Sequence, residues 1–260
     1  MRILWQGFTH PTMTGAYNDA LVAHLNDVAR EGTTLEFRGV VPPDRHLHRL
    51  TEWRCAIQAI GSALEAEQEG FDCVVLGHFQ DAGLWEMRGA LDVPVLGLGE
   101  GSMLYACQLG FRFGLVAISP LFQRWHEEQV ARYALEERLA GVRAMDTSVD
   151  LYVRTFEGDD DAGDDILAQF EREARALAEA GAEVVIPAGG FPALLLARRG
   201  VRELGGALIL DANAVLVKLA ETAVELHALN GTAASRHSTF AKASPEVLEE
   251  FSTVVARMNA

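Results

Sequence analysis

A histidine with two polar neighbours follows a short apolar run in the first third of the chain. The run occupies residues 73–76 and leads into Gly77, His78, Gln80 and Asp81. A short uninterrupted apolar run is typical of a parallel strand buried on both faces, and ligands of open α/β sheets bind beyond the carboxyl ends of such strands. An imidazole titrates near about 6.5, so it can accept and donate a proton at neutral pH. We therefore predict that His78 is an acid/base group.

The residues around this strand end also have simpler interpretations. Gln80 and Asp81 could orient the imidazole or bind polar atoms of a substrate, and Asp81 could equally cap the helix expected from Leu84. His78 could be a histidine that is hydrogen-bonded at a strand end and only orients a loop. The residue types alone leave these alternatives open.

The same pattern returns later in the chain. GAEVVIPAGGFP, from Gly181, repeats the order of glycine, acidic residue, apolar strand and turn seen in GFDCVVLGHFQD, and His78 corresponds to Gly189. Gly189 has no side chain to move a proton, but the N–H groups of Gly189 and Gly190 could bind a carboxylate or a developing enolate. Simple tight-turn geometry is the alternative. We predict that the two strand ends face each other across a cleft that holds a small molecule.

Regular alternation of apolar strands and helical patterns predicts the elements that position these groups. The fold class is α/β, with two similar doubly wound parallel-sheet (Rossmann-like) halves. The expected strands are 2–6, 33–40, 73–76, 93–98, 113–118, 142–145, 183–187 and 207–210. The expected helices are 14–29, 51–67, 84–90, 103–109, 121–139, 164–180, 191–199, 214–229 and 244–258. The expected domains are 1–98 with 212–230, then 99–211, and a C-terminal helical arm, 231–260.

The charge and hydropathy of the chain indicate which kinds of partner to expect. The formal charge of −15, from 22 basic and 37 acidic residues, argues against a nucleic-acid partner, because such a protein repels phosphate backbones. No apolar run approaches the roughly 20 residues of a membrane span, and the N-terminus lacks a signal-peptide pattern, so we expect a cytoplasmic protein without a membrane partner. The acidic run 157–165 is interpreted as a solvated loop that leads into a helix.

Neither a metal nor a nucleotide cofactor is indicated. The three cysteines are too scattered for a zinc site or a disulfide framework, and His46 and His48 have no recognisable third ligand. The glycines of residues 97–101 do not match the spacing of a dinucleotide fingerprint. We therefore expect no metal and no cofactor.

Two segments resemble a known family. Residues 77–119, GHFQDAGLWEMRGALDVPVLGLGEGSMLYACQLGFRFGLVAIS, and residues 180–192, AGAEVVIPAGGFP, are similar to the aspartate/glutamate/hydantoin racemase superfamily, and most closely to its hydantoin racemase branch. Two-base racemases of that family use one cysteine in each half, and the resemblance places these cysteines at His78 and Gly189. Both are replaced, so the resemblance implies chemistry other than two-cysteine racemisation. It also implies that Thr9 corresponds to a position that binds the substrate carboxylate, and Ser119, which stands at an equivalent strand end, is a further candidate for substrate binding.

The function that we expect combines these observations. The protein would be a cofactor-independent isomerase or lyase that acts on a small carboxylate or cyclic amide through a carbanion or enolate, with His78 as the single acid/base. A decarboxylase branch of the family that keeps one cysteine implies that the loss of one base need not abolish activity. The alternatives are a hydrolase of a cyclic imide or amide, and a non-catalytic protein that binds a small carboxylate. We expect a homo-oligomer, because the family commonly associates.

Overall fold

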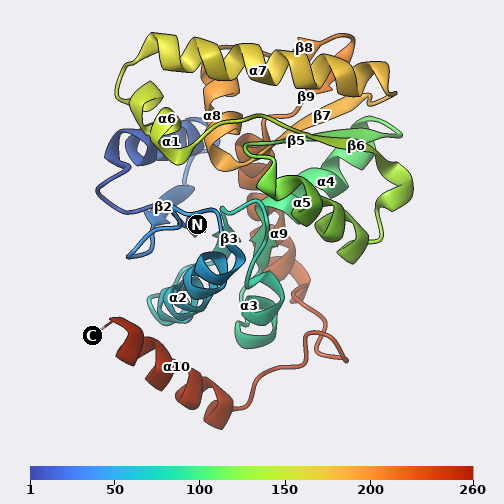
Figure 1. Ribbon diagram of the computed structural model, residues 1–260. Coiled ribbons are helices and arrows are strands. Elements are labelled where there is room, and N and C mark those ends of the chain that lie inside the picture. The colour runs from blue at the N-terminus through green and yellow to red at the C-terminus, as the bar shows by residue number, and fades with distance from the viewer. Residues whose placement is uncertain (260) are drawn as a thin grey trace. The chain divides into compact units, whose positions relative to one another are not determined.

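Two separate sheets organise the chain in the computed structural model, which describes residues 1–259 (Figure 1). The first sheet has the order β2-β1-β3-β4 and is entirely parallel; its strands are β1 (Arg2–Gln6), β2 (Thr34–Arg38), β3 (Cys73–Leu76) and β4 (Val95–Gly97). The second has the order β6-β5-β7-β9-β8, formed by β5 (Phe113–Ala117), β6 (Leu139–Ala144), β7 (Val184–Ala188), β8 (Glu203–Leu204) and β9 (Ala207–Ile209). All its pairs are parallel except the short antiparallel β8–β9 pair. The predicted α/β class with parallel sheets is confirmed.

Helices connect the strands in both sheets. They are α1 (Gly15–Val28), α2 (Arg49–Gln68), α3 (Leu84–Ala90), α4 (Leu98–Leu109), α5 (Leu121–Arg132), α6 (Val149–Phe156), α7 (Asp160–Glu179), α8 (Gly190–Arg198), α9 (Ala212–Asn230) and α10 (Pro245–Asn259), with a 3₁₀ turn at Glu136–Arg138. None of the helices in the described part of the chain combines the length and apolar character needed to span a bilayer.

The chain forms two compact units. Unit 1 comprises residues 1–15, residues 25–97 and the chain from Val217 onward, and it contains the first sheet. Unit 2 comprises residues 16–24 and 98–216, and it contains the second sheet.

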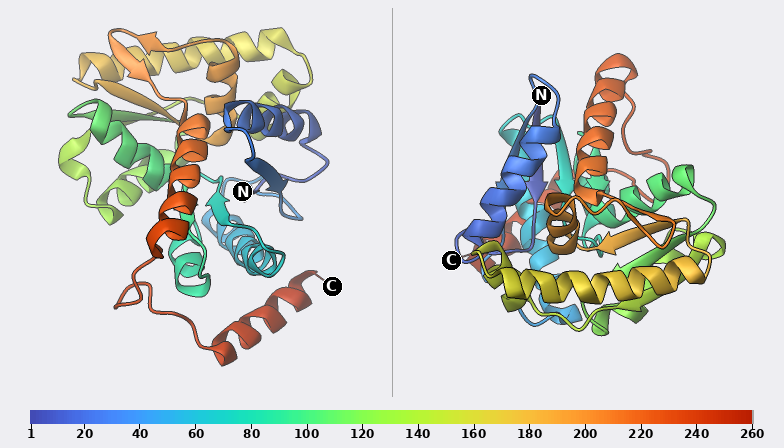
Figure 2. Two further views of the ribbon diagram at one scale, coloured as in Figure 1. Left: turned by 180° about the vertical axis from the view of Figure 1, so that it is seen from behind. Right: turned by 90° about the horizontal axis from the view of Figure 1, so that it is seen from above.

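The core of unit 1 lies between its sheet and α2. All four residues of β3 are buried, and α2 presents a stripe of small buried residues, among them Ala56, Ala59 and Ala63, to the core around Leu76. Small side chains let the helix approach the sheet closely. At the far end of the chain, α10 runs beside α2 (Figures 1 and 2), where its buried Val255 fits against Gly61.

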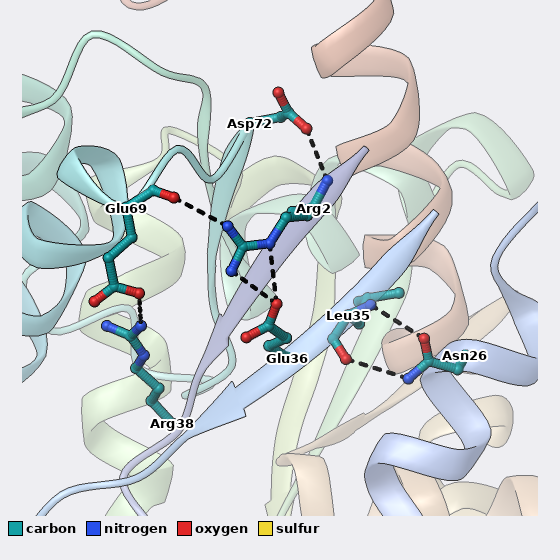
Figure 3. Close-up of polar contacts among 7 residues, drawn as sticks. All are labelled: Arg2, Asn26, Leu35, Glu36, Arg38, Glu69 and Asp72. Atoms are coloured by element: carbon teal, nitrogen blue, oxygen red, sulfur yellow. Dashed lines mark hydrogen bonds and ion pairs between the residues drawn. The ribbon is translucent and has the colours of Figure 1, made fainter. Parts of the chain in front are cut away.

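The amino ends of the strands in unit 1 are tied together by charged groups (Figure 3). Arg2 Nε and Nη2 donate to Glu36 Oε1 at 3.1 and 3.0 Å, and Asp72 Oδ2 accepts from the Arg2 N–H at 2.7 Å. The guanidinium also lies 4.1 Å from the centre of the Phe71 ring. Asn26 exchanges two hydrogen bonds with the main chain of Leu35. These contacts support one register for β1, β2 and β3, and with it the alignment of their carboxyl ends.

Unit 2 is built on two fully buried strands. Every residue of β5 and β7 is buried, and the long helix α7 lies along this sheet (Figure 2, right). The buried face of α7 carries Ile166, Phe170, Ala174 and Leu177 at helical spacing, which explains why this segment folds as an amphipathic helix.

Some element boundaries differ from the sequence-based expectation. The expected helix 121–139 is wrong: α5 ends at Arg132, because Ala134 adopts a φ of 55°, which breaks the helix. The glycines of residues 99–101 lie inside α4, which begins five residues earlier than expected. The short strand β8 was not expected.

The acidic run 157–165 is mostly helix rather than loop. Helix α7 begins at Asp160, and Asp159 Oδ1 accepts a hydrogen bond from the Ala162 N–H at 3.0 Å, as a helix N-cap does. Helix α6 before it was not expected either; Ser148 caps it by accepting from the Leu151 N–H at 3.2 Å. The solvated-loop interpretation is therefore wrong for residues 160–163, while the expectation that acidic residues favour the start of the next helix is confirmed.

The pH dependence of stability tests the contacts that Asp211 makes in unit 2. Its Oδ1 accepts from the Ala214 N–H at 3.0 Å, and its Oδ2 lies 3.2 Å from His24 Nε2. Burial opposes ionisation, but the Ala214 N–H and the adjacent His24 ring outweigh burial and hold the pKa of Asp211 below its usual range. The stabilisation is therefore present above about pH 4 and is lost as pH falls through the lowered pKa. Asp211→Asn keeps an N-cap but removes the charge, so we expect it to lower the free energy of unfolding by about 1 kcal/mol at pH 7.

Urea denaturation at pH 7, 5 and 3 measures this effect. The difference between wild type and Asp211→Asn should persist at pH 5 and shrink at pH 3. Asp19→Asn, at an exposed position of α1, serves as the matched control and should change little. A difference that stays constant down to pH 3 would contradict the account.

Candidate functional site

The carboxyl ends of β1 and β3 lie side by side in unit 1. Gln6 pairs with Leu76 in the sheet, and the Gly77 N–H donates to the Gln6 carbonyl at 2.8 Å. A Cβ at Gly77 would lie 2.0 Å from Trp5 Nε1, so only glycine fits here. The main chain therefore passes close over the Trp5 ring and places the next residue, His78, at the end of the sheet.

His78 forms a pair with Glu52. Its Nε2 lies 3.0 Å from Oε1 of Glu52, and both side chains are largely buried, with 16% and 13% of their surface exposed. The ring also stacks on Phe8, with ring centres 4.1 Å apart and planes 15° apart. A carboxylate can only accept a hydrogen bond, so Nε2 carries the proton in the neutral ring and Nδ1 holds a lone pair. Within residues 1–259, Nδ1 has no hydrogen-bond partner.

The partner of His78 was not identified from the sequence. Glu52 lies in the first turn of α2, where an acidic residue is common for helix stability alone. The imidazole hydrogen-bonds Glu52, and orientation of the ring by Gln80 or Asp81 stays a prediction. Gln80 is half-buried and Asp81 is buried, and for both the predicted contact with a substrate stays a prediction.

Asp81 occupies a strained turn beside β4. Its φ is 56°, and its carboxylate is so close to Gly97 that a Cβ there would lie 2.4 Å from Oδ1. The alternative that Asp81 caps α3 with its side chain is wrong, because the N-cap residue is Gly83 and the Leu84 N–H donates to the Asp81 carbonyl instead.

The loops after β1 and β2 enclose a cavity of about 280 Å³ in unit 1. It is lined by His10, Met13, Val41, Pro42, Pro43, Arg45, His46, Thr51 and Arg54. Arg54 donates to Gln58 Oε1 at 2.9 Å and to the Pro43 carbonyl at 3.4 Å, and neither Arg45 nor Arg54 is paired with a carboxylate in the described part of the chain. No acidic residue lines the cavity. In a chain of charge −15, this is a local environment that favours a small anion.

Thr9 lies on the same β1 loop but does not line the cavity. It is half-buried, and its carbonyl accepts from the Val40 N–H at 3.0 Å. His48 is the N-cap residue of α2, and its side chain accepts a hydrogen bond from the Leu50 N–H at 3.1 Å. No cluster of three or more residues able to hold a metal ion occurs among residues 1–259.

In unit 2, Gly189 is the N-cap residue of α8. Its φ of 162° is extended backbone that any residue adopts, and a Cβ would meet Pro192 Cδ at 3.3 Å and Ile118 Cγ2 at 3.5 Å. A side chain therefore fits after a small adjustment. The Gly189 N–H donates to the Pro187 carbonyl at 2.8 Å, so it is not available to an anion, which corrects part of the predicted backbone site.

The available donors are the N–H groups of Gly190 and Phe191. As the first residues of α8 they have no intrahelical acceptor, and they have no other acceptor in the described chain. Asn213, which the sequence did not suggest, is fully buried and donates to the Gly190 carbonyl at 3.4 Å. Ser119 is buried at the end of β5, where its Oγ accepts from the Leu121 N–H at 3.4 Å. Its predicted contact with a substrate stays a prediction.

The cysteines lie outside both strand-end sites. Burial raises the pKa of Cys55 to about 12 and also raises the pKa of Cys73, which lies inside β3. Burial raises the pKa of the half-buried Cys107 as well. These thiols therefore stay protonated at neutral pH, where a thiolate would be the reactive species.

Comparison with known proteins agrees with the α/β fold. Residues 7–220 match the family model described as "Asp/Glu/Hydantoin racemase". The chain therefore belongs to the Asp/Glu/hydantoin racemase family, and the resemblance inferred from the sequence is confirmed.

Two curated relatives are hydantoin racemases. The one from Pseudomonas sp. (strain NS671) is 31% identical over 169 residues, which is 62% of this chain and 62% of that protein. The one from Rhizobium meliloti is 27% identical over 177 residues, 68% of each chain. Among solved structures, the allantoin racemase from Klebsiella pneumoniae superposes with a TM-score of 0.77 at 25% identity and covers 94% of both chains.

Proposed function

We propose that the protein is a cofactor-independent enzyme that acts on a small carboxylate or cyclic amide through a carbanion or enolate, with His78 as its single acid/base. The observation that carries this proposal is the His78–Glu52 pair at the end of β3, which leaves the basic Nδ1 atom without a protein partner. Membership of a racemase family supports the reaction class, because racemisation begins by removal of a proton next to a carbonyl.

The rest of the site supports a reaction with one base. Position 189, which corresponds to 78 in the internal repeat, is a glycine, so it can neither accept nor donate a side-chain proton. Free N–H groups at the start of α8 suit the negative oxygen of an enolate. That the two strand ends act on one substrate stays a prediction of the repeat. A lyase or decarboxylase must protonate its carbanion only once, so a single acid/base group is sufficient for such chemistry.

The cavity beside the β1 and β2 loops supports an anionic substrate. A guanidinium without a carboxylate partner, such as that of Arg45, can pair with a substrate carboxylate, and an ion pair at an exposed position contributes up to about 1 kcal/mol. We expect Arg45→Ala to raise KM for a carboxylate substrate about twofold to fivefold while kcat changes little. Steady-state kinetics measure this, after NMR screening of substituted malonates, 2-amino acids and 5-substituted hydantoins has identified a substrate.

The same screen separates the reaction types. Loss of carbon dioxide, deuterium uptake with the skeleton retained, and ring opening identify decarboxylation, isomerisation and hydrolysis respectively. Arg257→Ala, at an exposed position of α10, is the matched control and should leave KM unchanged. Saturable binding without any product would contradict the proposal, and an unchanged KM in Arg45→Ala would contradict the role of the cavity.

A further inference from the structure

Glu52 is held in place more firmly than a surface carboxylate on a helix. Its N–H donates to the His48 carbonyl at 2.9 Å, and the next residue back, Thr51, donates from Oγ1 to Asp44 Oδ1 at 2.8 Å. His48 caps the same turn. Main-chain and side-chain hydrogen bonds therefore both hold the first turn of α2, which carries Glu52.

The Glu52 carboxylate has a single partner. Within the described chain its only hydrogen-bonding or ion-pair partner is His78 Nε2, although 13% exposure removes it from most solvent. Burial of a carboxylate costs free energy unless a donor compensates it, so the imidazole N–H is the group that compensates Glu52. Phe8 covers one face of the ring and limits its rotation.

We propose that Glu52 is a positioning residue that fixes the tautomer of His78, so that Nδ1 is the atom that exchanges a proton with the substrate. This inference rests on the proposed function and adds the atom and the residue that controls it. With Nε2–H bonded to Glu52, the Nδ1 lone pair takes the substrate proton, the C–H electron pair stays on the substrate as an enolate, and the imidazolium is stabilised by the adjacent carboxylate. Return of the proton from Nδ1 restores the neutral ring.

The tautomer is measured without any substrate. Two-bond ¹H–¹⁵N spectra of protein labelled with ¹⁵N-histidine report which ring nitrogen carries the proton, and His78→Gln assigns the signals of His78. We expect wild type at pH 8 to show protonated Nε2 and unprotonated Nδ1. Glu52→Gln should lose this preference, because its amide can donate to Nε2 as well as accept. Glu65→Gln, exposed on the same helix, is the control and should match wild type.

Kinetics then test the positioning role. Glu52→Gln should lower kcat about tenfold to a thousandfold with KM within about threefold, a smaller loss than that of His78 itself. Glu52→Asp, which keeps the carboxylate on a shorter stem, should recover part of kcat. A protonated Nδ1 in wild type, or a spectrum unchanged in Glu52→Gln, would overturn the inference. The expected spectra from a protein that turns over no substrate would instead count against the proposed function.

Discussion

His78→Ala is expected to reduce kcat on a confirmed substrate about a hundredfold to ten-thousandfold, because it removes the side chain proposed to exchange a proton with the substrate. KM should change much less, since the proposed anion contacts lie in the cavity lined by Arg45 and Arg54. Steady-state kinetics on purified, folded protein measure both constants.

A second substitution separates chemistry from folding. His78→Ala leaves the largely buried Glu52 without its donor, which also lowers stability. His78→Gln can still donate to Glu52 but cannot accept the substrate proton, so it should be better folded and equally inactive. His237→Ala, at an exposed position, is the matched control. Full turnover by His78→Gln would rule out His78 as the acid/base.

The double variant His78→Cys/Gly189→Cys is expected to racemise a hydantoin faster than wild type does. The family resemblance places the two cysteines of the racemases at these positions, and the structure of unit 2 tolerates the second one. The φ of Gly189 is extended, and the nearest atom to a new Cβ is Pro192 Cδ at 3.3 Å. Loss of optical activity of an enantiopure 5-substituted hydantoin, compared with the uncatalysed rate, measures the gain.

Each single variant is the control for the double variant. His78→Cys alone and Gly189→Cys alone supply one thiol each, so neither should racemise at more than about a hundredth of the rate of the pair. A folded double variant without racemisation, or equal racemisation by a single variant, would contradict the correspondence of positions 78 and 189.

The segments that follow simple local rules were predictable from the sequence. The bounds of β1, β3 and α3 match the expectation to the residue, because an apolar run between polar turns defines a buried strand and Gly83 marks the helix start. The place of His78 directly after β3 was also predictable, because it follows from the bounds of that strand, whereas its acid/base role stays a prediction.

The remaining features depend on contacts that are remote in sequence. Glu52 is 26 residues from His78, and only the packing of α2 beside β3 brings them together. The Gly189 N–H was expected to be free, but a local turn uses it for the Pro187 carbonyl. The early end of α5 depends on a left-handed Ala134, a conformation that an alanine does not predict.

The central claim is that one base, His78, delivers the proton from one face. Turnover in D₂O of a prochiral substrate, whose product has its stereocentre at the reprotonated carbon, tests it most directly. The account predicts a singly deuterated product of one configuration in wild type and no product above background in His78→Gln. Equal amounts of both deuterated enantiomers, or deuteration undiminished in His78→Gln, would contradict it.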